Sequence, residues 1–493
     1  MKRIVVWLLI SVIIISVFAG CQDNTANGNI SGETTTIAIN GETTIEETTA
    51  RVEADLPDNN YDGYNFRFLV REYDGNGYWG SKEVYAEEEI GDPINDAVYL
   101  RNRKIEEKYN IVISEMRSAN MLSDAQKVVR AGDHEYDCFM PHAGDAASLA
   151  QSQYLIDFNK LPYIDLSKPW WDQGSNNTLS IGGKYFFTMG ELNIMDNDAT
   201  YVMMFNKDVA NNFGIDDLYE SVMNNEWTFD KLYSVIQTVS EDLDGNGVYD
   251  DNDRFGLLTD NGAIMLGLFY ASGETLIKKD SQDYPVINTD LTRASAVMEK
   301  MLAIQADKTS TLLAEYLTHI SDPWTNGLNR LFKEGKGLFY AIGLTVMHKM
   351  RDMDSDFGLM PYPKFDESQE KYMNYVSSWC TNTVSVPVTT TDIDMASIII
   401  EALAAESLYT LTPAYYEITI VNKTIRDEGS GEMLDIILTN RIYDLGGIYN
   451  WSGIGNLPMN TKDAGEFISG VSKIESATQT AMEKTIDMIK EME

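Results

Sequence analysis

Apolar runs alternate with amphipathic segments along the chain after residue 62. Residues 66–70 are aromatic or aliphatic apart from one arginine and predict a strand. Residues 94–109 place Val98, Ile105 and Tyr109 on one helical face with charged residues between them, which predicts a helix. The pattern then predicts strands over residues 111–115 and 136–141 and helices over residues 123–131 and from residue 145 onward. This βαβαβα order predicts a mostly parallel sheet covered by helices.

Such a sheet binds its ligands at the carboxyl ends of its strands. In this chain those ends correspond to residues 71–79 and 141–145. His142, Gly144 and Asp145 in the second of these loops are therefore candidate ligand-binding residues. The alternative is that Asp145 only caps the helix that follows it.

Strand and helix patterns continue beyond residue 200. Strands are expected over residues 201–205, 255–258, 337–342, 358–361 and 383–388, and helices over residues 228–240 and 292–305. No internal repeat stands out. A chain of 493 residues with these elements is long enough for two α/β lobes with a cleft between them.

The chain begins like an export signal. Two basic residues precede an apolar run over residues 4–18, and Ala19, Gly20 and Cys21 follow. The run is short for a membrane span, so residues 1–20 are expected to be a lipoprotein signal peptide. Cys21 resembles the lipobox cysteine of bacterial lipoproteins, which is lipid-modified on its thiol, with palmitate as one such acyl group, and becomes the new N-terminus. The alternative is a plain secretory signal with an incidental cysteine.

Residues 21–61 are expected to be a flexible tether. They are rich in Thr and Glu, and no aromatic residue occurs before Tyr61. Such a segment cannot bury enough apolar surface to offset the entropy lost on ordering. With a lipid on Cys21, the tether would hold the remaining chain at the extracellular face of the bacterial cell membrane.

The charge of the chain restricts its partners. It carries 38 Lys and Arg against 76 Asp and Glu, a formal net charge of −38. Nucleic acid and anionic lipid are poor partners for such a surface, so contact with the membrane is expected through the lipid anchor only. Apart from Cys21 only Cys138 and Cys380 are present, and we expect buried thiols there and no disulfide framework.

Residues 242–253 match an EF-hand-type calcium loop. Side-chain oxygens occur at loop positions 1, 3, 5, 9 and 12, a glycine occurs at position 6, and a backbone carbonyl is available at position 7. The expected ligands are Asp242, Asp244, Asn246, Val248, Asp250 and Asp253. We expect the calcium to have a structural role; the alternative is an acidic turn that binds no metal.

Several segments together resemble one family. They are Phe205-Asn206-Lys207-Asp208, residues 226–232, the calcium loop with residues 254–257, residues 357–363 and residues 385–387. Their order and spacing resemble the extracellular solute-binding proteins of ABC transporters, in the carbohydrate-type family that includes maltose-binding protein.

The resemblance implies an α/β, two-lobe periplasmic-binding-protein-like fold with a hinge and an interlobe cleft. The first lobe would comprise residues 62–194 and about 290–345, and the second residues of about 200–283 and 356–493 with the calcium loop. The chain would cross between the lobes near residues 193–200, 283–290 and 344–356.

The implied function is capture of a carbohydrate, with an oligosaccharide favoured, by a monomer that performs no catalysis. The ligand would be delivered to the permease subunits of an ABC transporter. The alternative is a surface-anchored carbohydrate-active enzyme or a glycan-binding adhesin. The chain contains no G-x-S-x-G nucleophile motif and no Walker A sequence.

Aromatic and acidic residues supply the remaining candidate ligand contacts. Sugar rings stack their C–H faces on Trp and Tyr, and their hydroxyls pair with carboxylates and amides. The aromatic candidates are Trp170 and Trp171 in the first lobe and Trp379, Tyr449 and Trp451 in the second. Glu191 and Asp198 lie near the first crossing and could meet hydroxyls. The alternatives are core packing for the Trp170-Trp171 pair and pairing within the hinge for the carboxylates; Trp227 and Trp324 are assigned to the core.

Overall fold

The computed structural model describes residues 51–73, 78–416, 418 and 428–492. The chain divides into two units, residues 1–53 and 54–493, and every element below belongs to the second unit. The signal peptide, Cys21 and the tether up to residue 50 lie outside the described residues.

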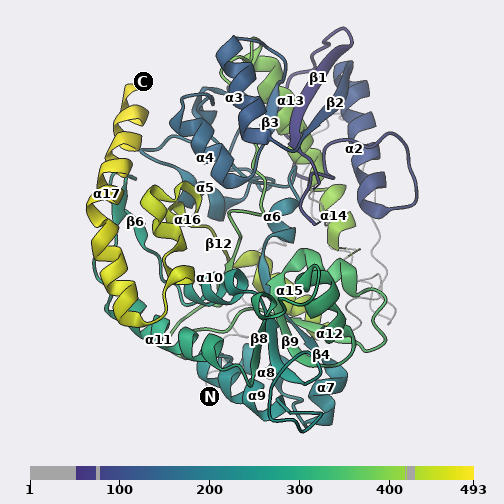
Figure 1. Ribbon diagram of the computed structural model, residues 1–493. Helices are drawn as coiled ribbons and strands as arrows, with labels where there is room; N and C mark the ends of the chain where they lie inside the picture. Colours follow the sequence, from purple (N-terminus) through teal and green to yellow (C-terminus); the bar gives the residue numbers. More distant parts are fainter. Residues whose placement is uncertain (1–50, 74–77, 417, 419–427, 493) are drawn as a thin grey trace, which may run out of the picture. The chain divides into compact units, whose positions relative to one another are not determined.

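The first sheet contains three parallel strands in the order β2-β1-β3. They are β1 (Tyr64–Arg71), β2 (Ile111–Ser118) and β3 (Cys138–Met140), with Phe68 of β1 opposite Glu115 and Cys138. The helices α2 (Pro93–Tyr109), α3 (Met121–Ala131) and α4 (Ala143–Gln151) alternate with them along the chain, as Figure 1 shows. The predicted βαβαβα order is confirmed.

Helix α2 shows why the sequence pattern succeeds here. Asp92 Oδ1 accepts the N–H groups of Ile94 and Asn95, and a proline occupies the first turn, where no N–H is needed. Asn110 ends the helix in the left-handed conformation at φ 48°. The buried face includes Val98, so local signals and burial agree.

The second sheet has five strands in the order β10-β4-β9-β5-β8. The strands are β4 (Tyr201–Asn206), β5 (Phe255–Thr259), β8 (Thr311–Leu313), β9 (Gly337–Gly343) and β10 (Phe357–Met360). β5 runs parallel to β8 and β9, whereas β4 runs antiparallel to β9 and β10. The helices α7 (Lys207–Asn212), α8 (Leu218–Met223), α9 (Phe229–Val239), α10 (Asn261–Ala271), α11 (Thr292–Ala306), α12 (Arg330–Lys333) and α15 (Glu428–Thr439) belong to the same lobe.

The structure corrects two of the expected lobe boundaries. Residues 290–345 were expected in the first lobe, but β8 and β9 are strands of the five-stranded sheet. Residues 384–407 lie within the range 356–493 that was expected in the second lobe, but they join the first lobe, where Phe139 and Ser385 exchange backbone hydrogen bonds of 2.8 and 3.0 Å. Helix α13 (Ile393–Ser407) is likewise buried in the core that contains β1. Apolar patterning predicts that a segment is a strand, but not which sheet it joins.

Among the described residues, two of the segments that connect the lobes lie near the cleft. The chain passes from the first lobe to the second over residues 193–200, as expected, and returns over residues 376–383, where Ser377 N donates to Ala199 O over 3.0 Å. The crossing expected near residues 344–356 is wrong, because the 3-10 helix η5 (Leu344–Met350) joins β9 to β10 within one sheet. Near residues 283–290 the hairpin of β6 (Ile277–Lys279) and β7 (Pro285–Ile287) meets first-lobe residues but remains a hairpin.

The C-terminal helix α17 (Ala464–Glu491) contacts both lobes (Figure 1). Phe467 in its first turn packs on Phe269 of α10, with ring centroids 6.0 Å apart. Near its other end, Thr485 Oγ1 accepts a 3.0 Å hydrogen bond from Gln151 of α4. None of the helices in the described part of the chain is long and apolar enough to cross a membrane.

The remaining elements are short. They are η2 (Phe158–Lys160), α5 (Gln173–Leu179), α6 (Met195–Asp198), η3 (Ala314–Tyr316), the π-helix η4 (Pro323–Asn329), β11 (Asn374–Tyr375), α14 (Leu411–Tyr416), β12 (Arg441–Ile442), α16 (Leu445–Tyr449), η7 (Trp451–Asn456) and η8 (Pro458–Asn460). Cys138 and Cys380 form no disulfide, and burial raises the pKa of the Cys138 thiol.

Candidate ligand-binding cleft

Three hollows adjoin one another through shared lining residues. The first-lobe hollow, of about 510 Å³, and the bridging hollow, of about 460 Å³, share Tyr73. The bridging hollow and the second-lobe hollow, of about 530 Å³, share Lys349. Together they form a candidate cleft that continues from one lobe to the other.

The first-lobe hollow lies at the carboxyl ends of the parallel strands. Its lining comprises Arg71, Glu72, Tyr73, Ser118, Ala119, Asn120, Met121, Leu122, Ser123, Gln126, His142 and Asp145. These residues end or follow β1 and β2, lie in α3, or lie at the start of α4. The hollow therefore occupies the sheet edge at which the sequence predicts a ligand.

His142 and Asp145 form one hydrogen-bonded unit in this hollow. His142 Nδ1 accepts the N–H groups of Gly144 at 3.1 Å and Asp145 at 3.3 Å, so the imidazole caps α4. Nε2 of the same ring lies 3.1 Å from Asp145 Oδ1. A Cβ at position 144 would come 3.1 Å from the imidazole, so glycine lets the ring lie over the helix start.

Trp379 presents an open ring beside this unit. It is 56% exposed, and its ring centroid lies 6.2 Å from that of His142. Arg71 Nη1 donates to the backbone oxygens of Trp379 at 3.3 Å and Cys380 at 3.4 Å. Trp379 was expected in the second lobe, but it belongs to the segment that returns to the first.

Trp170 and Trp171 lie in the core. They are 0% and 2% exposed, and the Trp171 indole N–H donates to Glu401 Oε2 over 2.8 Å. Phe158 contacts the Trp171 ring edge to face at 6.3 Å. Both indoles are buried in the core of the first lobe, so the structure favours the core-packing alternative for this pair.

Tyr449 and Trp451 are buried beneath the C-terminal helix. Their rings stack at 4.7 Å with an interplanar angle of 11°, and Trp451 Nε1 donates to Thr485 Oγ1 over 3.0 Å. They are 8% and 3% exposed. The structure does not bring them to the three hollows.

The two candidate carboxylates near the first crossing are buried. Glu191 accepts from the Thr412 hydroxyl, and burial raises its pKa. Asp198 accepts from Lys82 Nζ at 2.7 Å and from the Tyr415 hydroxyl at 2.9 Å. Burial alone would raise the pKa of Asp198, but Lys82 and His348 hold it well below its usual range. Asp198 therefore lies behind the bridging hollow and orients two of its lining side chains.

Trp324 offers an open ring on the second lobe. It begins the π-helix η4, is 38% exposed, and donates from Nε1 to Asp260 Oδ2 over 3.0 Å. Asp260 follows β5, and burial raises its pKa. The exposure of Trp324 contradicts the expectation that it lies in the core. The Asp-Pro start of this segment was the available signal of an irregular, exposed turn.

Several solved structures have a similar fold. A sugar transporter from Rhizobium etli in an open conformation aligns over 86% of this chain and 99% of its own, with a TM-score of 0.55 and 15% identity. The chain has the two-lobe solute-binding fold. A cyclo/maltodextrin-binding protein in complex with maltotetraose covers 87% and 97%, at a TM-score of 0.53 and 13% identity. A maltose/maltodextrin-binding domain from Bdellovibrio bacteriovorus, bound to maltotriose, covers 86% and 100%, at 0.50 and 12%.

Sequence comparison adds nothing to this result. The chain matches no protein-family model, and it matches no curated protein sequence.

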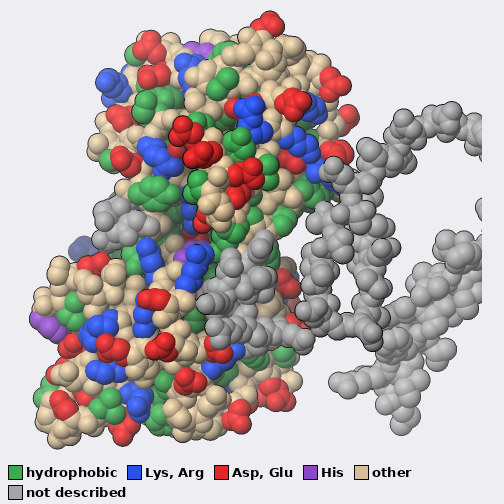
Figure 2. Space-filling model, turned by 90° about the vertical axis from the view of Figure 1, so that its right-hand side faces the viewer, with side chains coloured by type: hydrophobic (Ala, Val, Ile, Leu, Met, Phe, Trp, Pro, Cys, Tyr) green, Lys and Arg blue, Asp and Glu red, His purple; other side chains and the backbone are tan. Residues whose placement is uncertain are grey.

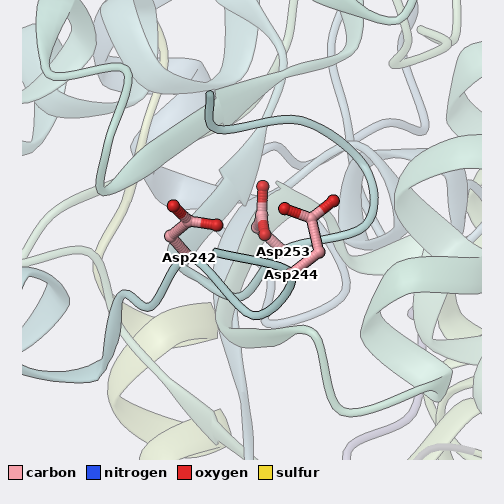
Figure 3. A group of neighbouring side chains, drawn as sticks. All are labelled: Asp242, Asp244 and Asp253. Carbon is pink, nitrogen blue, oxygen red and sulfur yellow. The ribbon is translucent and has the colours of Figure 1, made fainter. Parts of the chain in front are cut away.

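The acidic loop between α9 and β5 gathers three of its six predicted ligands. Carboxylate oxygens of Asp242, Asp244 and Asp253 lie within 4.8 Å of one another (Figure 3). Asp253 is buried and accepts the N–H groups of Leu243 at 2.9 Å and Asp250 at 2.8 Å, which joins the two ends of the loop.

The other three predicted ligands make local contacts. Asn246 Oδ1 accepts from Val248 N at 2.6 Å, Asp250 Oδ1 accepts from Asn252 N at 2.8 Å, and the Val248 side chain is 61% exposed. Gly247 at loop position 6 has φ 78°, the left-handed conformation that this sharp turn requires. The oxygen chemistry of the loop fits calcium.

Proposed function

We propose that this chain captures a carbohydrate, with an oligosaccharide favoured, between its two lobes and delivers it to the permease subunits of an ABC transporter. The single observation that carries the proposal is the pair of open indole rings, Trp379 beside the first-lobe hollow and Trp324 on the second lobe. Each ring has a polar neighbour, the imidazole of His142 at 6.2 Å or the carboxylate of Asp260 at 3.0 Å.

This combination suits a sugar. The C–H face of a pyranose stacks on an indole, and its ring hydroxyls hydrogen-bond to carboxylates and imidazoles. If both lobes contact the ligand, the closed form binds it with higher affinity than the open form does. Ligand binding then shifts the population toward the closed form. The solved structures bound to maltotriose and maltotetraose have the same fold and support this class of ligand.

A glycan screen tests the proposal. The purified protein is heated with individual oligosaccharides, and each sample is then analysed by mass spectrometry. We expect a higher melting temperature with at least one glycan and an unaltered glycan afterwards. Cleavage of the glycan would support a surface-anchored carbohydrate-active enzyme, binding without transport would support a glycan-binding adhesin, and no shift with any glycan would contradict the proposal.

We also propose that Cys21 carries a lipid and anchors the protein at the extracellular face of the bacterial cell membrane. The signal-like residues 1–20 support it. Cys21→Ala should release the protein from the membrane fraction or leave it unprocessed, whereas Cys380→Ala should change neither. An unmodified Cys21 in the mass spectrum of membrane-bound protein would contradict the anchor.

Finally, we propose that residues 242–253 bind a structural calcium ion. Asp242, Asp244 and Asp253 would supply carboxylate oxygens, and Asn246, Asp250 and the Val248 carbonyl would complete the set. The ion would supply charge neutralisation and rigidity to a loop between a helix and a strand. Calorimetric titration with calcium should give a binding signal at millimolar concentration.

A further inference from the structure

We propose that the bridging hollow binds an anionic group, so that the carbohydrate captured by this chain carries a carboxylate. The inference rests on the proposed function and specifies its ligand. It concerns the hollow between the loop after β1, the start of α2 and helix η5.

The lining of this hollow is basic in a strongly acidic chain. The formal net charge of the protein is −38, yet the hollow is lined by Lys82, Arg117, His348, Lys349 and Arg351. Asp92 is the acidic residue among the described lining residues, and its Oδ1 is occupied by the cap of α2. Figure 2 shows Lys and Arg side chains gathered beside a histidine near the middle of one face.

Some of these side chains already have acidic partners. Lys82 Nζ lies 2.7 Å from Asp198, and Arg117 Nη2 lies 2.7 Å from Glu115. Burial alone would lower the pKa of Lys82, but the Asp198 carboxylate raises it, so this ammonium stays charged. These two cations are fixed in place and largely neutralised.

Lys349 and Arg351 are different. Both are exposed, and neither lies within 4.0 Å of a carboxylate of the described residues. Lys349 Nζ sits 4.9 Å from the centre of the Tyr78 ring, and Arg351 Nη2 lies 3.5 Å from His348 Nδ1. Two cations that line one hollow of an acidic protein, and that have no acidic partner among the described residues, suit an anion from outside the chain.

The aromatic lining indicates what carries the anion. Tyr73 and Tyr85 border the same hollow and are 45% and 43% exposed. An inorganic anion would need no such faces, whereas a sugar acid has both an apolar ring face and a carboxylate. The tyrosines come from the first lobe and the two cations from the second, so one uronate residue could bridge the lobes as they close.

The experiment compares acidic glycans with their neutral esters. Isothermal titration measures trigalacturonate, a trimer of mannuronate, the methyl ester of each, maltotriose and sodium sulfate. We expect at least one uronate trimer to bind about tenfold or more tightly than its own ester, because charge-assisted hydrogen bonds are lost on esterification. The affinity should fall as salt is added.

Variants connect the preference to this hollow. Lys349→Gln and Arg351→Gln should each weaken uronate binding by about tenfold and leave binding of the ester unchanged. Lys473→Gln on the exposed face of α17 removes the same charge far along the chain and should have no effect. Circular dichroism melting confirms that each variant is folded.

The outcomes separate the inference from the proposed function. Neutral glycans that bind as well as uronates, or variants that keep the uronate preference, would overturn the inference and leave sugar capture intact. Sulfate binding without any glycan binding would indicate an inorganic anion and overturn both. Failure of every glycan and of sulfate would likewise overturn both.

Discussion

The indole N–H of Trp324 donates to Asp260 Oδ2 over 3.0 Å, which fixes the ring of the π-helix η4 against the carboxyl end of β5. The ring is 38% exposed although its nitrogen is occupied. Because the indole is already held in place, it loses little conformational entropy when a ligand stacks on it. The free energy of stacking is therefore offset less by side-chain ordering than it would be for a mobile ring.

Trp324→Ala should weaken binding of the sugar identified in the glycan screen by about 1–3 kcal/mol, the energy of burying and stacking one aromatic ring. Titration calorimetry measures the change. Trp227→Ala is the matched control, because Trp227 is fully buried and donates to Pro361 O, so its loss should lower stability and not the affinity of the folded fraction. Unchanged affinity in folded Trp324→Ala would remove this ring from the binding site.

Trp451→Ala should lower the free energy of unfolding by about 3–5 kcal/mol, the usual cost of removing a buried tryptophan. The ring packs on Tyr449 and bonds to Thr485 of α17, so its loss leaves a cavity under the C-terminal helix. Urea denaturation measures the effect. Sugar affinity should stay within error, and a selective loss of affinity would return Trp451 to the list of ligand contacts.

Glu401 should make stability depend on pH. Burial raises the pKa of Glu401 from 4.5 to about 7, so the folded state holds this proton more tightly than the unfolded state. Its contribution is complete below about pH 4.5 and is lost as the pH rises toward about 7, a change of at most about 3 kcal/mol.

Glu401→Gln keeps an acceptor for the Trp171 indole and should flatten this part of the pH dependence. Urea unfolding at about pH 5 and about pH 7.5 compares the parent, this variant and the exposed control Glu107→Gln. The same loss of stability in all three proteins would show that Glu401 is not responsible.

Chelation of calcium should lower the melting temperature of the parent protein, because the ion is proposed to bind only the folded loop. Asp244→Asn removes an exposed carboxylate of the loop and should abolish the response, whereas the exposed Asp133→Asn should retain it. Differential scanning calorimetry with and without a chelator decides this. An equal response in both variants would exclude residues 242–253 as its source.

The sequence predicted what depends on local pattern. The strand over residues 66–70 and the helix over residues 94–109 differ from β1 and α2 by no more than two residues at either end, because periodicity and capping are encoded nearby. The partners of β9 were not predictable in this way, since they are set by contacts with β4 and β5, far away in the sequence.

The sequence predicted where the candidate site lies, but it predicted only some of the side chains that form it. The loops after β1 and β3 follow from the parallel topology, and they do line the first-lobe hollow. Trp171 and Trp379 were both candidate ligand contacts, yet one is 2% and the other 56% exposed. Exposure depends on which elements cover a ring, here α13 over Trp171, and no local signal in the sequence reports it.

The C-terminal helix limits how the lobes can move. Its 28 residues span about 42 Å without a break, with Phe467 fastened to the second lobe and Thr485 to the first. Lys184 Nζ also donates to the carbonyl of Ile489 over 2.8 Å. An unbroken helix with a contact to each lobe resists any motion that would increase the distance between those two contacts. We therefore expect the lobes to rotate about an axis close to this helix. The displacement between the lobes would then be largest on the side of the molecule opposite the helix.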